Sequence, residues 1–575
     1  MTHTKVPSMG KRWLIPPVIT PEADRALQAF PPVLRQILFN RGYATDAEAR
    51  AFLKAEPDFD TDPFQMTDME AAVERIRYAL EQDEPIAIYG DYDVDGVTST
   101  ALLVDVLNAC GGKAHGYIPN RFDEGYGLNN EALSQLKDDG VKLVITVDCG
   151  IRSPDETLHA RTIGLDLIIT DHHHPSEGHL PPALAVINPK QLGDIYPDKD
   201  LAGVGIAYKL AEALISGQQS AISLQLTDLL DLVALGTVAD LAPLVGENRF
   251  LVRRGLRQMR ETTRQGLFSL AAVSELNLSK LNATDIGFRL GPRLNAAGRL
   301  DEALAAYELL TTKDVFRAGQ LAQQLDVQNR ERQRITREMQ AQAEALALAD
   351  ETDAFLLFAA HEGFNAGVVG LAASRLTEIY YRPSIVAHID TETTRGSCRS
   401  IPEFHITDAL DQCADLLVRH GGHAAAAGFT VENGKLDELI SRLKAIAREK
   451  LGGQDLRPTL TADAEVSLTE VRPDLLDNLK YLEPTGYGNP DAVFVARNAK
   501  VKSARTVGAE GKHLKMTLED ESGMSHDAIG FRLGHLQLDL PERVDLMFAY
   551  EINEFNGRVN YQLNLKDVKA AGIPD

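Results

Sequence analysis

The sequence predicts an α/β protein in three folded parts. These are a domain built on a parallel sheet, a second α/β domain joined to it by a long helix, and a C-terminal β barrel. From Pro85 onward, short apolar runs alternate with helical segments, which is the pattern of βαβ units and a parallel sheet. After Gly452-Gly453 the chain changes to short alternating runs separated by turn residues, which is typical of a small barrel or sandwich.

The length and composition of the chain are those of a globular protein with several hydrophobic cores. The chain has 575 residues, of which 44% are hydrophobic and 25% charged, so we expect three or four domains. No run approaches the roughly 20 apolar residues of a membrane span, and no secretory signal is evident at the N-terminus. Four scattered cysteines suit a reducing compartment. We therefore expect a cytoplasmic protein without a membrane segment.

The first 84 residues read as a helical lead-in with a packing role. Helical spacing covers residues 22–29, 33–40 and 46–54, and Thr45 is a plausible N-cap for the last of these helices.

The segment 85–300 is predicted to be the parallel-sheet domain. Its expected strands are 85–89, 143–147, 165–170 and 183–187. Its expected helices are an amphipathic one over 98–109 and two more over 203–214 and 224–238.

The rest of the chain is predicted to hold three segments. Residues 301–352 are rich in Ala, Gln, Glu and Arg without Pro, which predicts one long connector helix. Residues 353–451 read as a second α/β domain, with strands over 355–359 and 384–389 and helices over 367–379 and 406–419. Residues 459–575 read as a β domain, with runs at 493–495, 514–518, 546–550 and 561–565. An oligonucleotide-binding (OB) fold is one candidate for it.

Three carboxylates follow the first predicted strand of the sheet. Asp91, Asp93 and Asp95 alternate between Gly90 and Gly96. Close like charges raise each other's pKa values unless a cation neutralises them, so a bound divalent metal is the economical explanation. A solvated acidic turn is the alternative.

Acids and imidazoles also follow the later strands. Ligands of such sheets bind beyond the carboxyl ends of the strands, so these loops should converge. A carboxylate and imidazole set suits Mn2+ or Mg2+, and one this large can hold two cations that activate a water and stabilise a phosphoryl displacement. The converging residues are Asp93, Asp95, Asp148, His172, His173 and Asp240.

The net charge of −24 is unusual for a nucleic-acid binder. Arginine is nevertheless clustered within 249–264 and 330–337, which indicates either phosphate binding or solvated helix faces. The small residues of Gly421-Gly422-His423 and 424–428 likewise allow either a ligand phosphate or tight helix packing.

The motifs match a known family in order. They are Gly90-Asp91-Tyr92-Asp93-Val94-Asp95-Gly96, Val147-Asp148-Cys149-Gly150, Asp171-His172-His173 and Asp240. This series resembles the DHH phosphoesterase superfamily. The 421–429 stretch resembles the signature of its associated domain, and 485–490 resembles the entry to the β domain of one branch, the bacterial single-strand-specific 5′→3′ exonucleases.

The resemblance implies roles for the matching residues. Asp93, Asp95, Asp148, His172 and Asp240 would bind two Mn2+ or Mg2+ ions, with Asp148 bridging, and His173 would bind or polarise the scissile phosphate. Tyr89 stands where many members have a histidine ligand, which leaves Asp91 or water to complete the first metal site. Arg121 would hold a 5′ phosphate, Tyr126 would stack on a base, and the residues expected to contact the strand are Arg293, Arg299, Arg399 and His423.

The implied activity is 5′→3′ degradation of single-stranded DNA to mononucleotides in recombination and repair. We expect a monomer. A clamp between the two α/β domains would exclude a duplex. A single-strand-binding protein and repair helicases are the implied partners. Two alternatives are a DHH enzyme acting on oligonucleotides or cyclic dinucleotides and a non-catalytic binding module with a degenerate site. The small-substrate enzyme does not account for the connector, the β tail or the arginine clusters, and the module predicts missing ligands that are present here.

Overall fold

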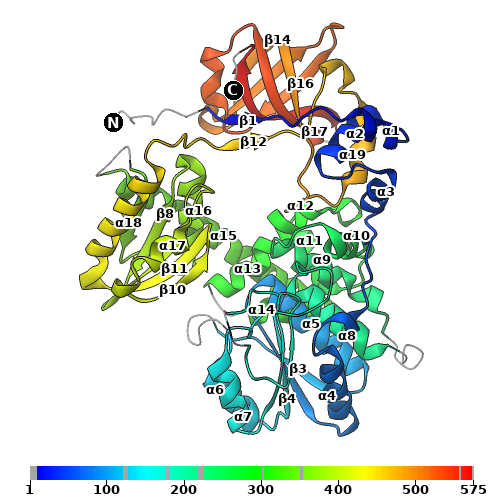
Figure 1. Ribbon diagram of the computed structural model, residues 1–575, viewed down its shortest axis with the longest axis vertical. Coiled ribbons are helices and arrows are strands. Elements are labelled where there is room, and N and C mark those ends of the chain that lie inside the picture. The colour runs from blue at the N-terminus through cyan, green and yellow to red at the C-terminus, as the bar shows by residue number, and fades with distance from the viewer. Residues whose placement is uncertain are drawn as a thin grey trace. The chain divides into compact units, whose positions relative to one another are not determined.

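The computed structural model describes residues 10–572 except 121–126, 177, 179, 217–223, 301–302, 350–353 and 556–557, and without the side chains of 299–300, 554–555 and 558. The chain divides into two compact units, which we describe separately (Figure 1). The larger unit comprises Leu14–Asp326 and Thr461–Asp575, and the smaller comprises Met1–Trp13 and Val327–Leu460. Among the described residues, no helix combines the length and apolar character needed to cross a membrane.

The larger unit contains the predicted parallel sheet. Its strands are β2 (Pro85–Gly90), β3 (Lys113–Tyr117), β4 (Leu143–Val147), β5 (Asp166–Thr170) and β6 (Ala185–Ile187), in the order β3-β2-β4-β5-β6 and all parallel. The sequence predicted all of these except β3. That strand reads KAHGY and is a partly exposed edge, so it lacks the apolar run that marks a buried strand.

Helices cover both faces of this sheet. Ile86 and Ile88 point into the core formed with α4 (Met69–Glu81), α5 (Val94–Ala109) and α8 (Gly203–Ile215). Ala87 and Tyr89 point to the other side, against α6 (Asn130–Asp138) and α7 (Pro154–Thr162), and Figure 1 shows the two layers. The alternation follows from the two-residue period of a strand.

The predicted amphipathic helix over 98–109 differs from the observed one. Helix α5 begins at Val94, one residue after Asp93, and nearly every side chain on it is buried. The sheet covers one side of the helix, and α8, α9 (Leu230–Ala239) and α14 (Leu304–Thr311) enclose the rest. Thr98, Ser99 and Thr100 create the amphipathic pattern, but their hydroxyls donate to carbonyls one turn back.

Helices continue after the sheet. They are α10 (Gly246–Arg260), α11 (Gln265–Val273), α12 (Ala283–Asp285), α13 (Gly291–Leu300) and α14. The long connector helix predicted over 301–352 is confirmed as α15 (Val315–Ala347), but its span is shorter, because α14 ends at Thr311 and a new helix begins at Val315. Asp314 caps α15 by accepting the N–H groups of Phe316 and Arg317, which separates the two helices.

The N-terminal helices match the prediction closely. They are α1 (Pro21–Ala26), α2 (Pro32–Asn40) and α3 (Asp46–Lys54), and Thr45 and Glu48 form a capping box on α3. Their apolar faces share a core with the C-terminal β domain, where Ile37 and Leu38 are buried together with Phe494 and Phe548.

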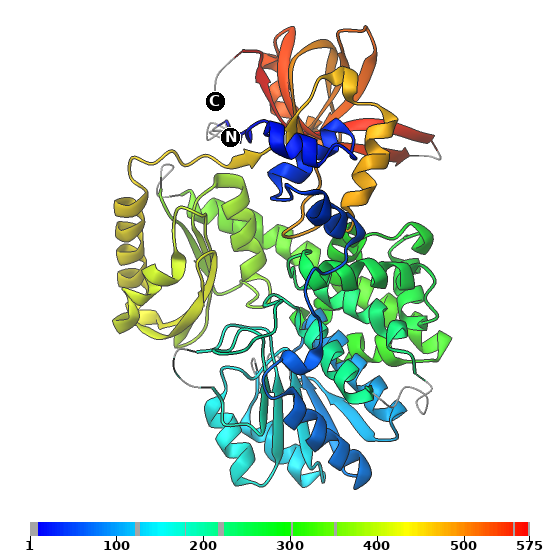
Figure 2. The same cartoon turned by 45° about the vertical axis from the view of Figure 1, so that its right-hand side comes forward.

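The C-terminal β domain is the predicted OB-like barrel (Figures 1 and 2). Its strands are β14 (Val493–Val507), β15 (His513–Glu519), β16 (Ser525–Gly530), β17 (Arg543–Phe555) and β18 (Arg558–Ala570). They pair in the order β14-β15-β16-β18-β17, and β17 pairs back to β14, which closes the barrel. β13 (Ala464–Glu465) and α19 (Pro473–Leu479) precede it, and β1 (Arg12–Leu14) pairs with β12 (Thr459–Thr461).

The smaller unit is an α/β domain with a mixed sheet. Its strands are β7 (Leu357–His361), β8 (Ser384–Ile389), β9 (Thr393–Arg399), β10 (Leu417–His423) and β11 (Ala426–Glu432), in the order β10-β11-β9-β8-β7. β7 and β8 are parallel and the other pairs are antiparallel. Figure 2 shows α18 (Leu436–Leu451) and α16 (Val369–Tyr380) on opposite faces of this sheet.

The helix predicted over 406–419 is wrong. Helix α17 (Ile406–Asp411) ends early, and β10 pairs with β11 instead. The 421–428 stretch therefore forms a hairpin and not a close helix contact. Gly421 and Gly422 are poor helix formers, so tertiary pairing decides the conformation here.

Candidate metal centre

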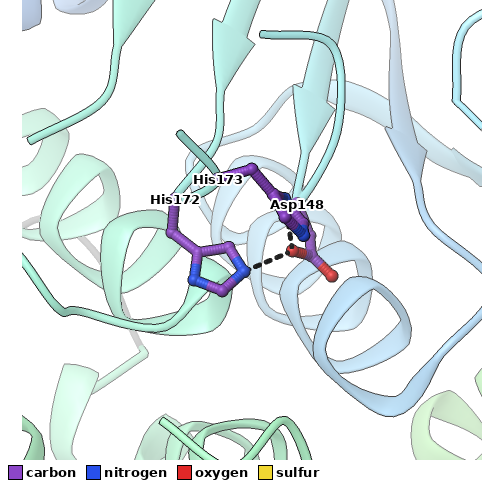
Figure 3. A group of neighbouring side chains, drawn as sticks. All are labelled: Asp148, His172 and His173. Atoms are coloured by element: carbon purple, nitrogen blue, oxygen red, sulfur yellow. Dashed lines mark ion pairs between the residues drawn. The ribbon is translucent and has the colours of Figure 1, made fainter. Parts of the chain in front are cut away.

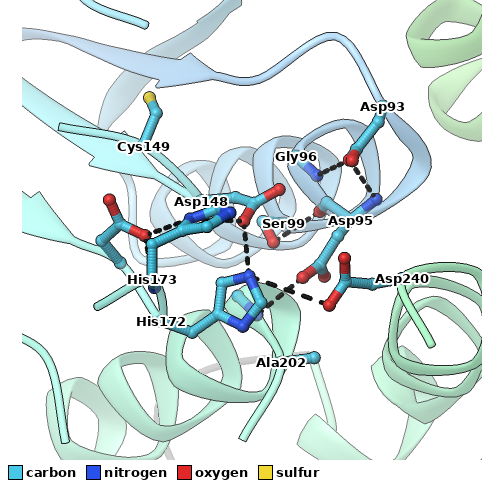
Figure 4. Close-up of polar contacts among 12 residues, drawn as sticks. Asp93, Asp95, Gly96, Ser99, Asp148, Cys149, His172, His173, Ala202 and Asp240 are labelled. Atoms are coloured by element: carbon cyan, nitrogen blue, oxygen red, sulfur yellow. Dashed lines mark hydrogen bonds and ion pairs between the residues drawn. The ribbon is translucent and has the colours of Figure 1, made fainter. Parts of the chain in front are cut away.

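The candidate site lies where the strand order of the parallel sheet reverses. The chain crosses from β3 over β2 to β4, so the loops after β2 and β4 lead to opposite faces of the sheet, which is where open α/β sheets bind their ligands. Asp91, Asp93 and Asp95 follow β2, and Asp148 follows β4. His172 and His173 follow β5, and Asp240 follows α9 (Figure 4).

These side chains form three overlapping groups of possible metal ligands. One group is Asp91, Asp93 and Asp148; another is Asp95, His172 and Asp240; the third is Asp148, His172 and His173. Within each group, one ligand atom per residue lies within 4.8 Å of the others. Asp148 and His172 each belong to two groups, which links the three groups into one cluster. This cluster contains every residue that the sequence predicted as a metal ligand.

Asp148 and His172 face each other at the centre of the site (Figure 3). His172 Nε2 lies 3.1 Å from Asp148 Oδ1 and 3.8 Å from Asp240 Oδ2. Both Nε2 and Asp148 Oδ1 are buried, and neither makes a hydrogen bond within the described part of the chain. Asp148 also has a φ of 61°, which is costly for a residue with a side chain. Converging lone pairs that lack donors fit a divalent cation.

The electrostatics of the carboxylates agree with this fit. Burial raises the pKa of Asp95 to about 7, with the charge of Asp93 adding to the effect. Burial, followed by Asp95, raises the pKa of Asp240 to about 9, and burial with the same neighbours raises the pKa of Asp148 well above its usual range. Burial and His173 lower the pKa of His172 to about 3, so its ring is neutral and its lone pair can bind a metal. Carboxylates crowded in this way need a cation to stay ionised at neutral pH.

Asp95 also holds the helix that closes the site. Its two carboxylate oxygens accept the N–H groups of Gly203 (2.7 Å) and Val204 (2.8 Å), at the N-terminus of α8. A Cβ at Gly203 would lie 2.9 Å from the Cβ of Asp148, and a Cβ at Gly236 of α9 would lie 2.9 Å from Asp95 Oδ1. Glycine is therefore required at both positions for α8 and α9 to approach the carboxylates. Neither glycine could be recognised from the sequence, since no local pattern marks a contact between distant segments.

Asp171 orients the second histidine. Its Oδ1 accepts from His173 Nδ1 at 2.8 Å and from the His173 N–H at 3.0 Å, and its Oδ2 accepts the N–H of Ile151. Burial opposes protonation of His173, but the hydrogen bond to Asp171 and its charge outweigh burial and raise the pKa of His173. Asp171 belongs to the motif Asp171-His172-His173, but its role in orienting His173 was not predicted. The available signal is an acid directly before a histidine pair.

Asn295 links α13 to the acidic loop. Its Oδ1 accepts the N–H of Val94 at 3.1 Å, between Asp93 and Asp95. Asp93 Oδ1 in turn accepts the N–H groups of Asp95 and Gly96 and so caps α5. No local sequence signal marks Asn295 for this role.

Tyr89 is turned away from the candidate ligands. It is buried, and its hydroxyl donates to the carbonyl of Gly127 and accepts from Asn129 Nδ2. It therefore fixes Gly127 and Asn129, just before α6, on the far face of the sheet. Asp91, which the sequence offered as a substitute ligand, is buried and grouped with Asp93 and Asp148.

The residues expected to contact DNA have different surroundings. Arg121 and Tyr126 lie outside the described residues, as does the side chain of Arg299. Arg293 Nε forms an ion pair with the buried Asp326 at 3.0 Å, and its Nη1 donates to the carbonyl of Arg289. Arg399 and His423 belong to the smaller unit, where Arg399 is half-buried on β9 and His423 exposed on β10.

The first arginine cluster has largely structural partners. Arg249 is buried, so it neither binds phosphate nor lies on a solvated helix face, the two predicted alternatives. Its guanidinium donates to the carbonyls of Phe52, Tyr481, Leu482, Glu483 and Pro484. Arg264 is partly buried and pairs with Asp231 and Asp105. Arg254 and Arg257 are the exposed members of this cluster. In the second cluster, Arg334 pairs with Glu331 and Glu338 on α15.

Comparisons with known proteins match nearly the whole chain. The "DHH family, N-terminal domain" matches residues 85–237, the "DHHA1 domain" matches 353–449, and the "RecJ OB domain" matches 462–567. The single-stranded-DNA-specific exonuclease RecJ of Bacillus subtilis is 40% identical over 93% of this chain and 68% of its own length. The RecJ of Salmonella typhimurium is 36% identical over 95% of this chain and 98% of its own.

Solved structures of RecJ proteins are also similar to this chain. The RecJ of Thermus thermophilus in complex with Mn2+ superposes with a TM-score of 0.84 at 29% identity, covering 98% of this chain and 80% of that one. The Mg2+ complex of the same protein gives a TM-score of 0.78 at 28% identity, covering 98% and 79%. With its domains and its full-length relatives in agreement, this chain belongs to the RecJ family of the DHH superfamily.

Proposed function

We propose that this protein degrades single-stranded DNA from the 5′ end to mononucleotides, by two-metal hydrolysis of the phosphodiester bond, in DNA recombination and repair. The relatives named above are single-stranded-DNA-specific exonucleases, and the solved ones hold Mn2+ or Mg2+. The observation that carries the proposal is the set of three ligand groups that share Asp148 and His172.

The proposed ligands divide between two cations. Asp91 and Asp93 would serve one, Asp95, His172 and Asp240 would serve the other, and Asp148 would bridge them. When bound, two divalent cations neutralise charge on the phosphodiester and activate a water for attack. The carboxylates supply the complementary negative charge. Their positions are fixed because Asp95 accepts backbone N–H groups at the start of α8 and Asp93 accepts one at the start of α5.

His173 is proposed to act on the scissile phosphate. Its Nδ1 is engaged by Asp171, which leaves Nε2 to face the substrate. The raised pKa favours the protonated ring, whose Nε2–H would donate to a non-bridging oxygen and stabilise charge that develops during the displacement. Together with Asp148 and His172, His173 completes the proposed catalytic set.

The strand-contacting roles of Arg121, Tyr126, Arg293, Arg299, Arg399 and His423 stay proposals that rest on the resemblance. For Arg293 to contact a phosphate, the phosphate must compete with Asp326 for the guanidinium. A cytoplasmic location, a monomeric state and an association with a single-strand-binding protein and helicases also stay proposals. The four free cysteines are consistent with a reducing compartment.

The test is degradation of end-labelled single- and double-stranded oligonucleotides with Mn2+, Mg2+ or EDTA. We expect 5′ mononucleotide release from the single strand alone, lost with EDTA and with Asp148→Asn. Asp138→Asn, which removes an exposed carboxylate at the end of α6, is the control and should keep full activity. Release from the 3′ end would refute the polarity, and cleavage confined to dinucleotides would favour the small-substrate alternative.

A further inference from the structure

A lysine in the loop after β6 lies beside the candidate metal ligands. Asn188 directly follows β6 and is buried. Its Nδ2 donates to the carbonyl of His173 at 2.9 Å, and its Oδ1 accepts the N–H of Lys190 at 2.8 Å. One buried amide therefore joins the backbone of Lys190 to the loop that presents the histidine pair. Lys190 belongs to none of the motifs that carry the family resemblance.

The side chain of Lys190 reaches the segment that leads into α8. Its Nζ lies 3.7 Å from Asp200 Oδ1. The carbonyl of Asp200 accepts from Asn248 Nδ2 at 2.6 Å, and Asn248 Oδ1 accepts the N–H of Ala202 at 3.4 Å. Helix α8 begins at the next residue, and its first two N–H groups bind the carboxylate of Asp95. Lys190 is thus held between the histidine loop and the helix that closes the site.

The charge of Lys190 acts on two of the proposed ligands. Burial raises the pKa of Asp240 to about 9, and the charge of Lys190 opposes that rise. Burial and His173 lower the pKa of His172 to about 3, and the charge of Lys190 adds to that effect. Together with the backbone contacts, these effects place the ammonium beside the ligand group that Asp240 and His172 share with Asp95.

The ion pair of Lys190 is weak enough to be exchanged. At 3.7 Å it is longer than a hydrogen bond, and the side chain of Asp200 is 56% exposed, whereas that of Lys190 is 17% exposed. Ion pairs with a solvated partner contribute little to stability. Among the residues that the structure describes, no other carboxylate lies at ion-pair distance from Lys190. A phosphate oxygen that entered the site would therefore compete with Asp200 for the ammonium.

The charge balance of the site favours such a contact. Two divalent cations would leave one negative charge on the proposed carboxylates, and the phosphodiester adds another. A lysine ammonium is a compact positive charge that binds phosphate. It can therefore offset charge that the cations leave. The proposed carboxylates are those of Asp91, Asp93, Asp95, Asp148 and Asp240.

We propose that Lys190 is a further substrate-binding residue of this centre, and that its ammonium leaves Asp200 to contact a non-bridging oxygen of the scissile phosphate. The proposal rests on the function proposed above and adds a residue that the family motifs do not contain. Asn188 is a positioning residue for this contact, because its side chain joins the backbone of Lys190 to that of His173. A lysine with a purely structural role would be insensitive to the charge of the phosphate.

The test compares two oligothymidylates that resist cleavage at the first linkage from the 5′ end. One has a methylene group in place of the bridging 3′ oxygen, which keeps the negative charge of that linkage. The other has a neutral methylphosphonate there. In Mn2+, Lys190→Met should weaken binding of the charged strand about tenfold, the size expected for a hydrogen bond between charged groups. It should leave binding of the neutral strand at the wild-type value, since the cycle isolates the pairwise contact. Equal losses on the two strands would overturn the proposal.

Two further variants serve as controls. Lys142→Met makes the same change of charge at an exposed residue directly before β4, at the opposite end of the sheet. It should bind both strands like the wild type. Lys190→Arg keeps a positive charge and should keep most of the affinity for the charged strand, and a loss as large as that of Lys190→Met would count against a charge contact.

Binding of Mn2+ alone separates a lost contact from a damaged site. In a calorimetric titration without DNA, Lys190→Met should bind Mn2+ at least as tightly as the wild type, because a nearby positive charge is removed. Weaker binding of Mn2+ would show that the lysine supports the ligands structurally, and it would overturn the proposal. A wild type that releases no mononucleotide from the 5′ end of an unmodified strand would instead refute the proposed function.

Discussion

Asp171 Oδ1 and His173 Nδ1 lie 2.8 Å apart, and this contact orients the histidine ring and raises its pKa. Asp171 is buried, and burial alone would raise its pKa. The hydrogen bond from His173 and the charge of His173 outweigh burial and lower the pKa of Asp171. The pair therefore couples a buried carboxylate to an imidazole beside the proposed metal ligands.

Asp171→Asn should lower kcat while leaving the fold intact. Asparagine can still accept from Nδ1, but it removes the charge that raises the pKa of the ring. Outer-shell partners of this kind typically change activity by about 10- to 100-fold, and we expect a loss in that range with little change in KM for single-stranded DNA. Steady-state kinetics on a labelled strand measures this. A loss confined to KM would place His173 in substrate binding alone.

Gly203→Ala tests the close approach of α8 to the carboxylates. The added methyl would lie 2.9 Å from the Asp148 Cβ and 3.0 Å from Asp95 Oδ2, so the helix or the carboxylates must shift. Overpacking of this kind costs about 1–3 kcal/mol, and displacing catalytic groups by about 1 Å can cost about 100-fold in rate. We expect a loss of that order in activity.

Gly205→Ala, two residues along the same helix, is the matched control. Its Cβ would meet Leu201 at 3.3 Å and no carboxylate, so the activity should stay near that of the wild type. Thermal unfolding of both variants would separate loss of stability from loss of geometry. Equal activity in the two variants would show that α8 can move without disturbing the site.

Metal binding should stabilise the larger unit through Asp148. A ligand that binds only the folded state adds about 2.7 kcal/mol when its free concentration is 100-fold above Kd. We expect Mn2+ to raise the unfolding temperature of the wild type, as read by scanning calorimetry, and to leave Asp148→Asn unchanged. In EDTA the variant should unfold at a higher temperature than the wild type, because one of several crowded carboxyl groups is gone.

Asp138→Asn should respond to Mn2+ like the wild type, since this residue lies on the exposed side of α6. A full Mn2+ response in Asp148→Asn would remove Asp148 from the proposed ligands.

The elements that could be predicted from the sequence are those whose local pattern agrees with their surroundings. β4 and α3 were predicted to the residue, since β4 is a buried apolar run and α3 begins with a capping box. β3 and the end of α17 were missed because their structure depends on pairing with distant strands. No local preference in Lys113–Tyr117 or Leu417–His423 indicates that pairing.

The candidate ligands could be predicted because they follow strands of one parallel sheet, whose carboxyl ends must meet. The residues that hold them could not. Gly203, Gly236 and Asn295 act through contacts across more than 100 residues of sequence, for example the 201 residues between Val94 and Asn295. Arg249 was misjudged for the same reason, because an arginine on an amphipathic helix gives no sign that five carbonyls will enclose it.

The β barrel should owe part of its stability to Asp520, in a pH-dependent way. Asp520 Oδ1 accepts from Ser522 and from the N–H of Met524, and Oδ2 accepts from Arg472 and His526. Burial opposes ionisation, but these hydrogen bonds outweigh burial and lower the pKa of Asp520. A carboxyl whose pKa is lowered by folding stabilises the fold above its ordinary value near 4, and this contribution is lost as the pH falls toward the lowered value.

Asp520→Asn should therefore lower the free energy of unfolding by about 2 kcal/mol near neutral pH. The difference from the wild type should shrink below about pH 4. Urea unfolding of the full chain, with β15 and β16 followed by hydrogen exchange corrected for intrinsic rates, measures the difference at each pH. Asp527→Asn changes an exposed neighbour on β16 that lies 3.6 Å from Lys515, and it should show little effect at any pH. A difference that persisted unchanged to pH 3 would mean that packing, and not the carboxylate charge, stabilises the turn between β15 and β16.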